Sequence, residues 1–393
     1  MDRALPKLSR RMSVLAPEGA YKVLAKTVKL EAQGKKIIHF EIGQPDFPTP
    51  KNVSKAGVKA IRDGQTRYGP TLGIYPLRQA IAKELSDTRS VEVSADQIAI
   101  TPSGKTAIFA AMSAVIEAGD EVIYPNPSFP TYEIIIDYLG AVRKPIPLLE
   151  ENSFSFDMKV FRKQFSEKTK LIVLNSPSNP TGGVMPKEDL EEIRKMVKGT
   201  QTWVMTDDMY AKIVFDGIDY TSFYTFADVH ENTMLVDGFS KAYAMTGWRI
   251  GYISAPLRIM EKIDYLLTHI EGGTASFTQY AALEALQGPQ DSVREMVKSF
   301  DERRKYVVKA FNEIPGITCS MPEGAFYAFP NVKSFGKSSA EIADYLLEEA
   351  GVALLDGKYF GEFGEGYLRL SYATSMENIK KGIEQIATAL KKI

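Results

Sequence analysis

Five short apolar segments, rich in valine, isoleucine and leucine, recur through the first 240 residues of the chain. The clearest is Leu171-Ile172-Val173-Leu174, a wholly apolar run that is typical of a strand buried on both faces of a parallel sheet. The five segments end near residues 100, 124, 175, 206 and 236, and each is followed by glycine, proline or polar residues. Because open α/β sheets bind ligands at the carboxyl ends of their strands, this pattern predicts an α/β sheet with one pocket at that edge.

The composition narrows the class of protein. The chain has 393 residues, 44% hydrophobic and 25% charged, which is enough for a large core and two domains. The formal net charge of −1 predicts no binding to nucleic acid, and the short apolar runs predict no membrane helix. Residues 1–11 are charged and lack the apolar core of a secretory signal.

Cysteine and histidine are scarce. The single Cys319 allows no internal disulfide, which is typical of a reducing compartment, so we expect a cytoplasmic location. With three histidines and no HExxH or CxxC pattern, the sequence predicts no metal site.

The fifth apolar segment leads into residues 238–249, which contain Lys241, Arg249 and almost no other charge. A lysine in apolar surroundings loses its proton readily and can form a Schiff base with an aldehyde cofactor. An arginine nearby can hold a phosphate. The plain alternative is a surface loop that happens to contain a lysine.

A second candidate is Ser103-Gly104-Lys105, which follows a short strand and begins an apolar helix. Small residues at a helix N-terminus attract phosphate, because backbone N–H groups point at it. The run nearly fits the phosphate loop G-x-x-x-x-G-K-[ST] of nucleoside triphosphatases, with Asp207 as a magnesium ligand. However, alanine replaces the first glycine and Pro102 lacks an N–H, which weakens that alternative.

Polar residues also follow the third and fourth apolar segments. Asn179 stands in an Asn-Pro-Thr-Gly run that, taken alone, is a turn. Asp207 and Tyr210 follow the next segment, and Asp208 adjoins Asp207. Two adjacent carboxylates at a strand end are rarely both structural. We assign Asp207 and Tyr210 to the chemistry and expect Asp208 to face solvent or cap a helix.

Four isolated residues have both a structural and a functional interpretation. Gly43 lies in a loop rich in glycine and proline, where it would let the backbone approach a substrate. Tyr68 would ordinarily anchor a loop, and Phe129 would ordinarily lie in the core. Arg369 is the lone arginine of an alternating strand, where it would ordinarily face solvent.

Together these motifs resemble the class I and II aminotransferases, which use pyridoxal 5'-phosphate (PLP), and the aspartate aminotransferase-like group is the most similar. The matching runs are Ser240-Lys241 with residues 245–252, G-x-P-D-F at 43–47, N-P-T-G at 179–182, D-x-x-Y at 207–210 and R-L-S-Y-A at 369–373. The resemblance implies fold type I. A large α/β domain with a mainly parallel seven-stranded sheet would span residues 45–285, and a smaller α+β domain would combine residues 1–44 and 286–393.

The resemblance also implies roles. Lys241 would hold PLP as a Schiff base and move the substrate proton, and Asp207 would keep the pyridine nitrogen protonated so that the ring acts as an electron sink. Asn179 and Tyr210 would donate hydrogen bonds to the ring oxygen. The full set of implied cofactor-binding residues is Tyr68, Ser103, Gly104, Lys105, Phe129, Asn179, Asp207, Tyr210, Ser240, Lys241 and Arg249. Tyr68 would reach the phosphate of the neighbouring subunit, so the resemblance implies a homodimer with a shared site.

For the substrate, the resemblance places Arg369 on the α-carboxylate as a bidentate fork, beside Gly43 and Asn179. Lys105 matches a lysine that reaches a side-chain carboxylate, which favours aspartate or glutamate as donor and a 2-oxo acid such as 2-oxoglutarate as acceptor, with ping-pong kinetics. Lys105 as a mere phosphate neighbour stays open.

Two departures from the group complicate this assignment. The charge of Glu18 would repel a dicarboxylate, and Gly238 stands where some relatives have a phosphate-binding serine. Transamination of aromatic or other neutral amino acids, and a PLP-dependent lyase or synthase on the same fold, are the alternatives. A PLP-binding regulator would need a DNA-binding domain for which the chain has no room.

Overall fold

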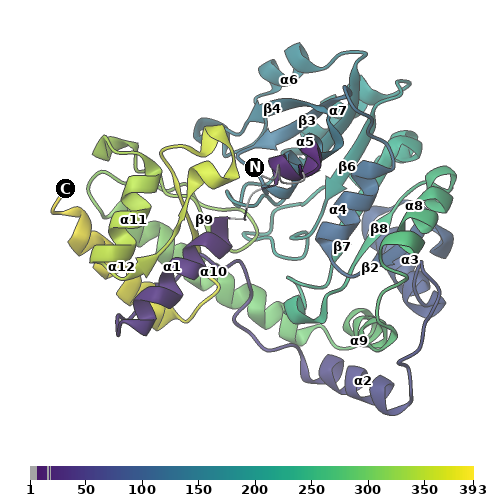
Figure 1. Ribbon diagram of the computed structural model, residues 1–393, viewed down its shortest axis with the longest axis horizontal. Coiled ribbons are helices and arrows are strands. Elements are labelled where there is room, and N and C mark those ends of the chain that lie inside the picture. Colours follow the sequence, from purple (N-terminus) through teal and green to yellow (C-terminus); the bar gives the residue numbers. More distant parts are fainter. Residues whose placement is uncertain (1–6, 16, 18) are drawn as a thin grey trace, which may run out of the picture.

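The computed structural model describes residues 7–393 except residues 16 and 18, and its central feature is a seven-stranded sheet (Figure 1). The strands, in spatial order, are β2 (Ile98–Thr101), β8 (Gly251–Ser254), β7 (Thr233–Gly238), β6 (Trp203–Asp207), β5 (Thr169–Asn175), β3 (Glu121–Asn126) and β4 (Val142–Pro147). Strand β8 runs antiparallel to both neighbours, and all other neighbouring strands are parallel. The sheet is therefore mixed and mainly parallel, as the resemblance implied.

The five strands predicted from apolar runs are β2, β3, β5, β6 and β7, and each is confirmed. Two strands of the sheet have no such run. Strand β4 contains an arginine, a lysine and two prolines. It is the outermost strand of the sheet, so a proline without an N–H can lie there without breaking a hydrogen bond to a further strand. Strand β8 has the sequence Gly-Tyr-Ile-Ser, which contains no continuous apolar run.

Helices cover both faces of the sheet. Helices α4 (Gly104–Ser113), α5 (Thr131–Leu139) and α8 (Leu257–Ile270) pack on one face. On the other face, α6 (Met158–Gln164) and α7 (Lys187–Val197) cover the β3–β5–β6 half. Helices α2 (Lys51–Arg62), α3 (Tyr75–Arg89) and α9 (Ser276–Gln287) cover the β2–β8–β7 half. Burial on both faces explains why the central strands are apolar throughout.

A second core lies beside the sheet and includes the C-terminal helix, whereas the N-terminal 3-10 helix Arg10–Val14 lies against α5 (Figure 1). The helices of this core are α10 (Asp291–Asn312), α11 (Ser339–Glu349) and α12 (Met376–Leu390), and α1 (Gly19–Ala32) is joined to α11 by the Lys26–Asp344 ion pair. Strands β11 (Leu355–Asp356), β12 (Leu368–Ser371) and β9 (Tyr327–Ala328) form an antiparallel sheet, and β1 (Ile38–His39) pairs in parallel with β10 (Val352–Ala353). The sequence predicts a long helical stretch over residues 278–314 with one break at Gly288-Pro289. Helices α9 and α10 confirm it, with the break between them at those two residues.

The sequence also predicts one continuous helix over residues 8–33, and this is wrong in its first half. A short 3-10 helix spans Arg10–Val14, Leu15 is extended, and α1 begins only at Gly19. Pro17 lies in the interruption, and because proline has no backbone N–H it cannot serve as an interior residue of a helix that starts at residue 8. The proposed conflict at Glu18 lies outside the described residues.

Candidate active site

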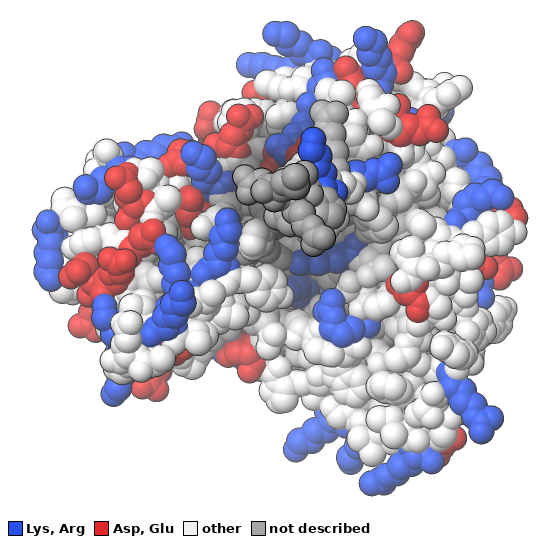
Figure 2. All heavy atoms as spheres, in the orientation of Figure 1, with Lys and Arg blue, Asp and Glu red and all other residues white. Residues whose placement is uncertain are grey.

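A cavity of about 1380 Å³ opens at the carboxyl ends of the central strands. Figure 2 shows basic side chains within the hollow. Of the residues proposed from the sequence, all but Tyr68 line it: Gly43, Ser103, Gly104, Lys105, Phe129, Asn179, Asp207, Tyr210, Ser240, Lys241, Arg249 and Arg369. Tyr68 is fully exposed and does not line the cavity of its own chain. The fold therefore gathers residues from seven separate segments of the chain into one place.

The N-terminus of α4 forms one wall. Ser103 is its N-cap, and its Oγ accepts a hydrogen bond from the N–H of Thr106 at 3.2 Å. Strand β8 approaches so closely that a Cβ on Gly251 would lie 2.7 Å from the nitrogen of Gly104, so only glycine fits there. The first N–H groups of a helix have no partner within it, and α4 presents them to the cavity as an anion cradle.

Asp207, the last residue of β6, supplies a buried carboxylate to the cavity. Its Oδ2 accepts a hydrogen bond from the Tyr132 hydroxyl at 2.5 Å, and its Oδ1 accepts one from the N–H of Met209 at 3.1 Å. Burial raises the pKa of Asp207 to about 6, against the lowering effect of the Tyr132 and Met209 hydrogen bonds. At neutral pH the group is therefore mainly a carboxylate, placed to pair with a cation.

Lys241 lies in the turn after β7 and crosses toward the N-terminal part of the chain. Its Nζ donates a hydrogen bond to the carbonyl oxygen of Gly43 at 2.6 Å and lies 5.8 Å from the ring centroid of Phe326. Gly43 itself has no room for a side chain, because a Cβ would lie 2.3 Å from the hydroxyl of Tyr327. The lysine is thus half-buried against backbone and aromatic surface.

Arg249 lies at the exposed rim of the cavity. It has a left-handed backbone (φ 56°), and its Nη1 donates a hydrogen bond to the carbonyl of Thr246 at 3.0 Å. Ser240, next to Lys241, is buried. Both are within the same turn as the lysine, so one segment carries an amine, a hydroxyl and a guanidinium.

Arg369 of β12 is buried at the opposite wall. Its Nη1 donates to Asn179 Oδ1 at 3.2 Å, and its Nη2 donates to the carbonyl of Glu41 at 2.5 Å. The guanidinium carbon lies 4.6 Å from the ring centroid of Tyr327 and 4.9 Å from that of Phe360. These contacts fix the plane of the guanidinium, which suits it to bidentate recognition of a carboxylate.

Several residues of the cavity escaped the sequence analysis. Tyr132 holds Asp207 from α5, and Tyr327 shares a hydrogen bond with the hydroxyl of Tyr210 at 2.7 Å. Asn175 ends β5 and bonds both the N–H of Asn179, at 3.1 Å, and the carbonyl of Asp207, at 3.3 Å. Asn175 is a polar residue at a predicted strand end, a usable signal, whereas nothing in the sequence pattern marks Tyr132.

The expectation for Asp208 is wrong. Its side chain is fully buried and forms an ion pair with Arg89 at 3.0 Å. Consecutive side chains along an extended segment point in opposite directions. Asp207 therefore faces the cavity, and Asp208 faces the core between the sheet and α3.

Two features of the described part of the chain bear on other classes of protein. No helix there is both long and apolar enough to cross a membrane. No group of three or more histidine, cysteine, aspartate or glutamate residues there is arranged to hold a metal ion.

The family model for aminotransferase class I and II matches residues 35–386. The chain therefore belongs to the class I and II aminotransferases, a family that uses PLP, and the triphosphatase alternative fails. It is 37% identical to a probable aspartate/prephenate aminotransferase of Aquifex aeolicus, over 98% of this chain and 99% of that one. It is 38% identical to the (5-formylfuran-3-yl)methyl phosphate transaminase of Methanocaldococcus jannaschii, over 98% of this chain and 100% of that one.

The solved structure of the Thermus thermophilus aspartate aminotransferase with maleate is similar in fold. Its TM-score is 0.92 at 33% identity, and the alignment covers 98% of this chain and 100% of that one. The fold assignment from the sequence is thereby confirmed.

Proposed function

We propose that the protein is a PLP-dependent aminotransferase that takes aspartate or glutamate as amino donor and a 2-oxo acid such as 2-oxoglutarate as acceptor. One observation carries the proposal. Besides Lys241, the cavity holds three cations among the described residues, Lys105, Arg249 and Arg369. With Arg249 at the rim for the cofactor phosphate, Lys105 and Arg369 remain for the two carboxylates of a dicarboxylic amino acid.

The residues present fit PLP. The buried carboxylate of Asp207 suits a protonated pyridine nitrogen, because an opposite charge stabilises it. The α4 N-terminus, with Ser103 and Gly104, suits the phosphate, and Arg249 adds a cation at the rim. Lys241 would hold the aldehyde carbon. When bound, PLP supplies an electron-poor ring that stabilises negative charge on the substrate Cα.

The remaining cavity residues would complete the binding of PLP. Tyr210 and Asn179 would donate to its ring oxygen, Phe129 would stack on its ring, and Ser240 would support its phosphate. Burial of the Tyr210 hydroxyl, together with the neighbouring Tyr327, raises its pKa well above the ordinary value. Tyr210 is therefore a neutral hydrogen-bond donor at physiological pH.

The substrate steps follow from positions in the cavity. Arg369 would bind the α-carboxylate and so fix the orientation of Cα, since its own plane is fixed by Asn179 and by two aromatic rings. Lys241 Nζ would then take the proton from Cα and return it on the cofactor side, as general base and acid. Gly43, whose carbonyl accepts a hydrogen bond from Lys241, would hold the amine in place.

We further propose the domain division implied by the resemblance, with residues 45–285 as the PLP-binding domain and residues 1–44 and 286–393 as the smaller one. A homodimer with a shared site is part of the same proposal. Tyr68 is fully exposed on its own chain, so its ring is free to reach a neighbouring subunit as the family role requires.

A second candidate is transamination of amino acids with large apolar or aromatic side chains. The cavity has an apolar wall made of Ala20, Tyr21 and Leu24 of α1 with Ile108 and Phe277. The names of the two relatives, with prephenate and a furan phosphate as substrates, support a cavity that accepts a ring together with an anionic group.

The test compares aspartate, glutamate and phenylalanine as donors with 2-oxoglutarate as acceptor, in the wild type and in Lys105→Met. Loss of one hydrogen bond to a charged group costs about 1.5–3 kcal/mol, so kcat/KM for aspartate should fall about 10- to 100-fold. The value for phenylalanine should change little. Lys59→Met is the matched control, because that lysine is exposed on α2, pairs with Asp63 and does not line the cavity. Equal losses for both donors would remove the recognition role of Lys105.

A further inference from the structure

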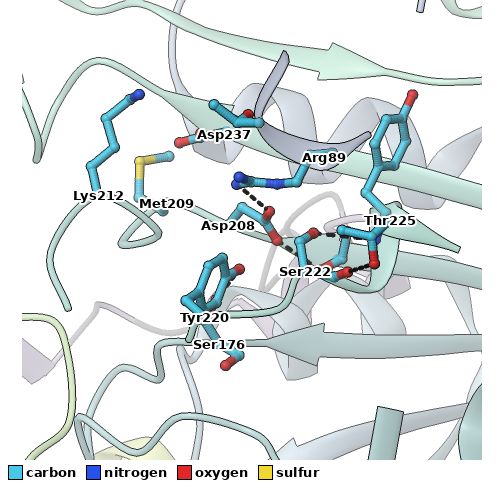
Figure 3. Close-up of polar contacts among 12 residues, drawn as sticks. Arg89, Ser176, Asp208, Met209, Lys212, Tyr220, Ser222, Thr225 and Asp237 are labelled. Atoms are coloured by element: carbon cyan, nitrogen blue, oxygen red, sulfur yellow. Dashed lines mark hydrogen bonds and ion pairs between the residues drawn. The ribbon is translucent and has the colours of Figure 1, made fainter. Parts of the chain in front are cut away.

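A charged cluster joins α3 to the segment after β6, and Figure 3 shows its residues Arg89, Asp208 and Lys212. Two residues of α3, Glu84 and Arg89, reach the turn that follows β6. Arg89 Nη2 pairs with Asp208 Oδ2 at 3.0 Å, and Glu84 pairs with Lys212. In the first pair α3 supplies the cation, and in the second it supplies the anion. Together the two pairs hold residues 208 and 212 at the two ends of the turn.

The turn held in this way carries active-site residues on its other side. Asp207 precedes it, and Met209 and Tyr210 within it line the cavity. The Met209 N–H donates to Asp207 Oδ1, so the shape of the turn sets the direction of that carboxylate. The N–H of Asp208 bonds the carbonyl of Val236 at 2.9 Å, which joins the turn to β7.

Both ion pairs are largely shielded from solvent. The side chains of Arg89 and Asp208 are 13% and 0% exposed, and those of Lys212 and Glu84 are 33% and 23% exposed. Burial lowers the pKa of Lys212, but Glu84 outweighs it and the net pKa is raised. Each cation therefore remains charged, and removal of its partner would leave a buried charge uncompensated.

A third carboxyl group, that of Asp237, lies beside the two pairs. It accepts hydrogen bonds from the N–H of Gly238 at 2.6 Å and from the Tyr252 hydroxyl at 3.1 Å. Burial, together with the nearby Asp208, raises the pKa of Asp237 well above its ordinary value.

We propose that Arg89 and Glu84 of α3, with their partners Asp208 and Lys212, are positioning residues that hold the turn after β6 and thereby aim Asp207 and Tyr210 at the cofactor. This rests on the proposed binding of PLP in the cavity. None of the four lines the cavity. They act only through the residues of the turn.

The test uses Asp208→Asn, which keeps the shape of the side chain and removes its charge. PLP affinity of the apoprotein is measured by titration, and the protonation of the bound ring nitrogen by ¹⁵N NMR. Steady-state kinetics then separate kcat from KM. Asp87→Asn is the matched control, because Asp87 pairs with Lys83 on the same helix at an exposed position.

Asp208→Asn should weaken PLP binding about tenfold, the size typical for loss of a supporting partner of a ligand. It should lower kcat and leave the KM for the amino donor nearly unchanged, because the affected residues contact the cofactor and not the donor. The signal of the ring nitrogen should move toward the neutral form. Arg89→Lys, which keeps the charge, should fall between the wild type and Arg89→Met. Asp87→Asn should match the wild type.

Unchanged PLP affinity and an unchanged ring-nitrogen signal in a folded variant of lowered Tm would reduce the two pairs to a structural role and overturn the proposal. If Asp208→Asn does not fold, Glu84→Gln and Lys212→Met at the more exposed pair are measured in the same way, and unchanged values there overturn it equally. A wild-type protein that binds no PLP would instead refute the proposed function.

Discussion

Replacement of Asp207 by asparagine should affect the apoprotein and the PLP-bound protein in opposite directions. In the apoprotein the Asp207 carboxylate is buried, and burial raises its pKa from 3.8 to about 6 although the charge of Lys241 acts in the opposite direction. Between these two values the folded protein binds more protons than the unfolded chain. Its stability therefore falls as the pH rises through this range. The difference between the two pKa values lowers the free energy of unfolding by about 3 kcal/mol at neutral pH.

The asparagine variant cannot ionise, and its side-chain oxygen can still accept the Tyr132 hydrogen bond. Because asparagine does not ionise, the free energy of unfolding of apo Asp207→Asn should exceed that of the wild type by about 1 kcal/mol at about pH 4.5 and by about 3 kcal/mol at about pH 7.5. The stability difference between the two proteins should thus grow by about 2 kcal/mol over that interval. Loss of the anion should at the same time weaken the hold on a protonated pyridine ring, so PLP affinity and kcat should fall.

The assay is urea unfolding of both apoproteins at the two pH values, followed by PLP titration. Other titrating groups are common to both proteins and cancel in the difference. A stability difference that is the same at both pH values would refute the assignment of a raised pKa to Asp207. Unchanged PLP affinity in the variant would refute its pairing with the cofactor.

Three other changes test separate parts of the site. Lys241→Ala should abolish transamination and the covalent attachment of PLP, and a variant with near-normal turnover would overturn the lysine assignment. Ser103→Ala should lose the N-cap of α4, at a cost of about 1 kcal/mol in unfolding free energy, and should bind PLP less tightly; unaltered affinity would exclude the α4 N-terminus as the phosphate site. The hydrogen bond from His39 to Glu41 raises the pKa of His39 to about 9, so its stabilisation is fully present below pH 6.5 and is lost as the pH rises through about 9. His39 is partly exposed, so this contribution is about 1 kcal/mol or less, and His39→Gln should flatten the alkaline part of the stability profile; an identical profile would contradict it.

The sheet could be predicted from the sequence because its central strands are buried on both faces and must therefore be apolar throughout. Strand β4 could not be predicted in this way, because it lies at the edge of the sheet and an edge strand tolerates Arg143, Lys144 and two prolines. The helix predicted from residue 8 failed because apolar periodicity does not register a single proline, Pro17. Periodic patterns thus predict elements well where burial is uniform and poorly at edges and interruptions.

The site could be predicted where a motif is contiguous in the chain, as at Lys241 and at Asn179. Contacts between segments that are far apart in the sequence produce no contiguous motif. Arg89 and Asp208 are 119 positions apart, and Tyr132 meets Asp207 only because α5 packs beside β6. Asp208 was misjudged because its neighbour Asp207 faces the cavity, and only the alternation of side chains in the folded turn separates their roles.

The central claim is that this cavity moves an amino group from a dicarboxylic amino acid to PLP. The most direct measurement loads the purified protein with PLP and adds aspartate with no 2-oxo acid present. We expect the visible absorption of the lysine-bound cofactor to disappear and one oxaloacetate to form per subunit. Bound PLP with no oxaloacetate released would contradict the claim.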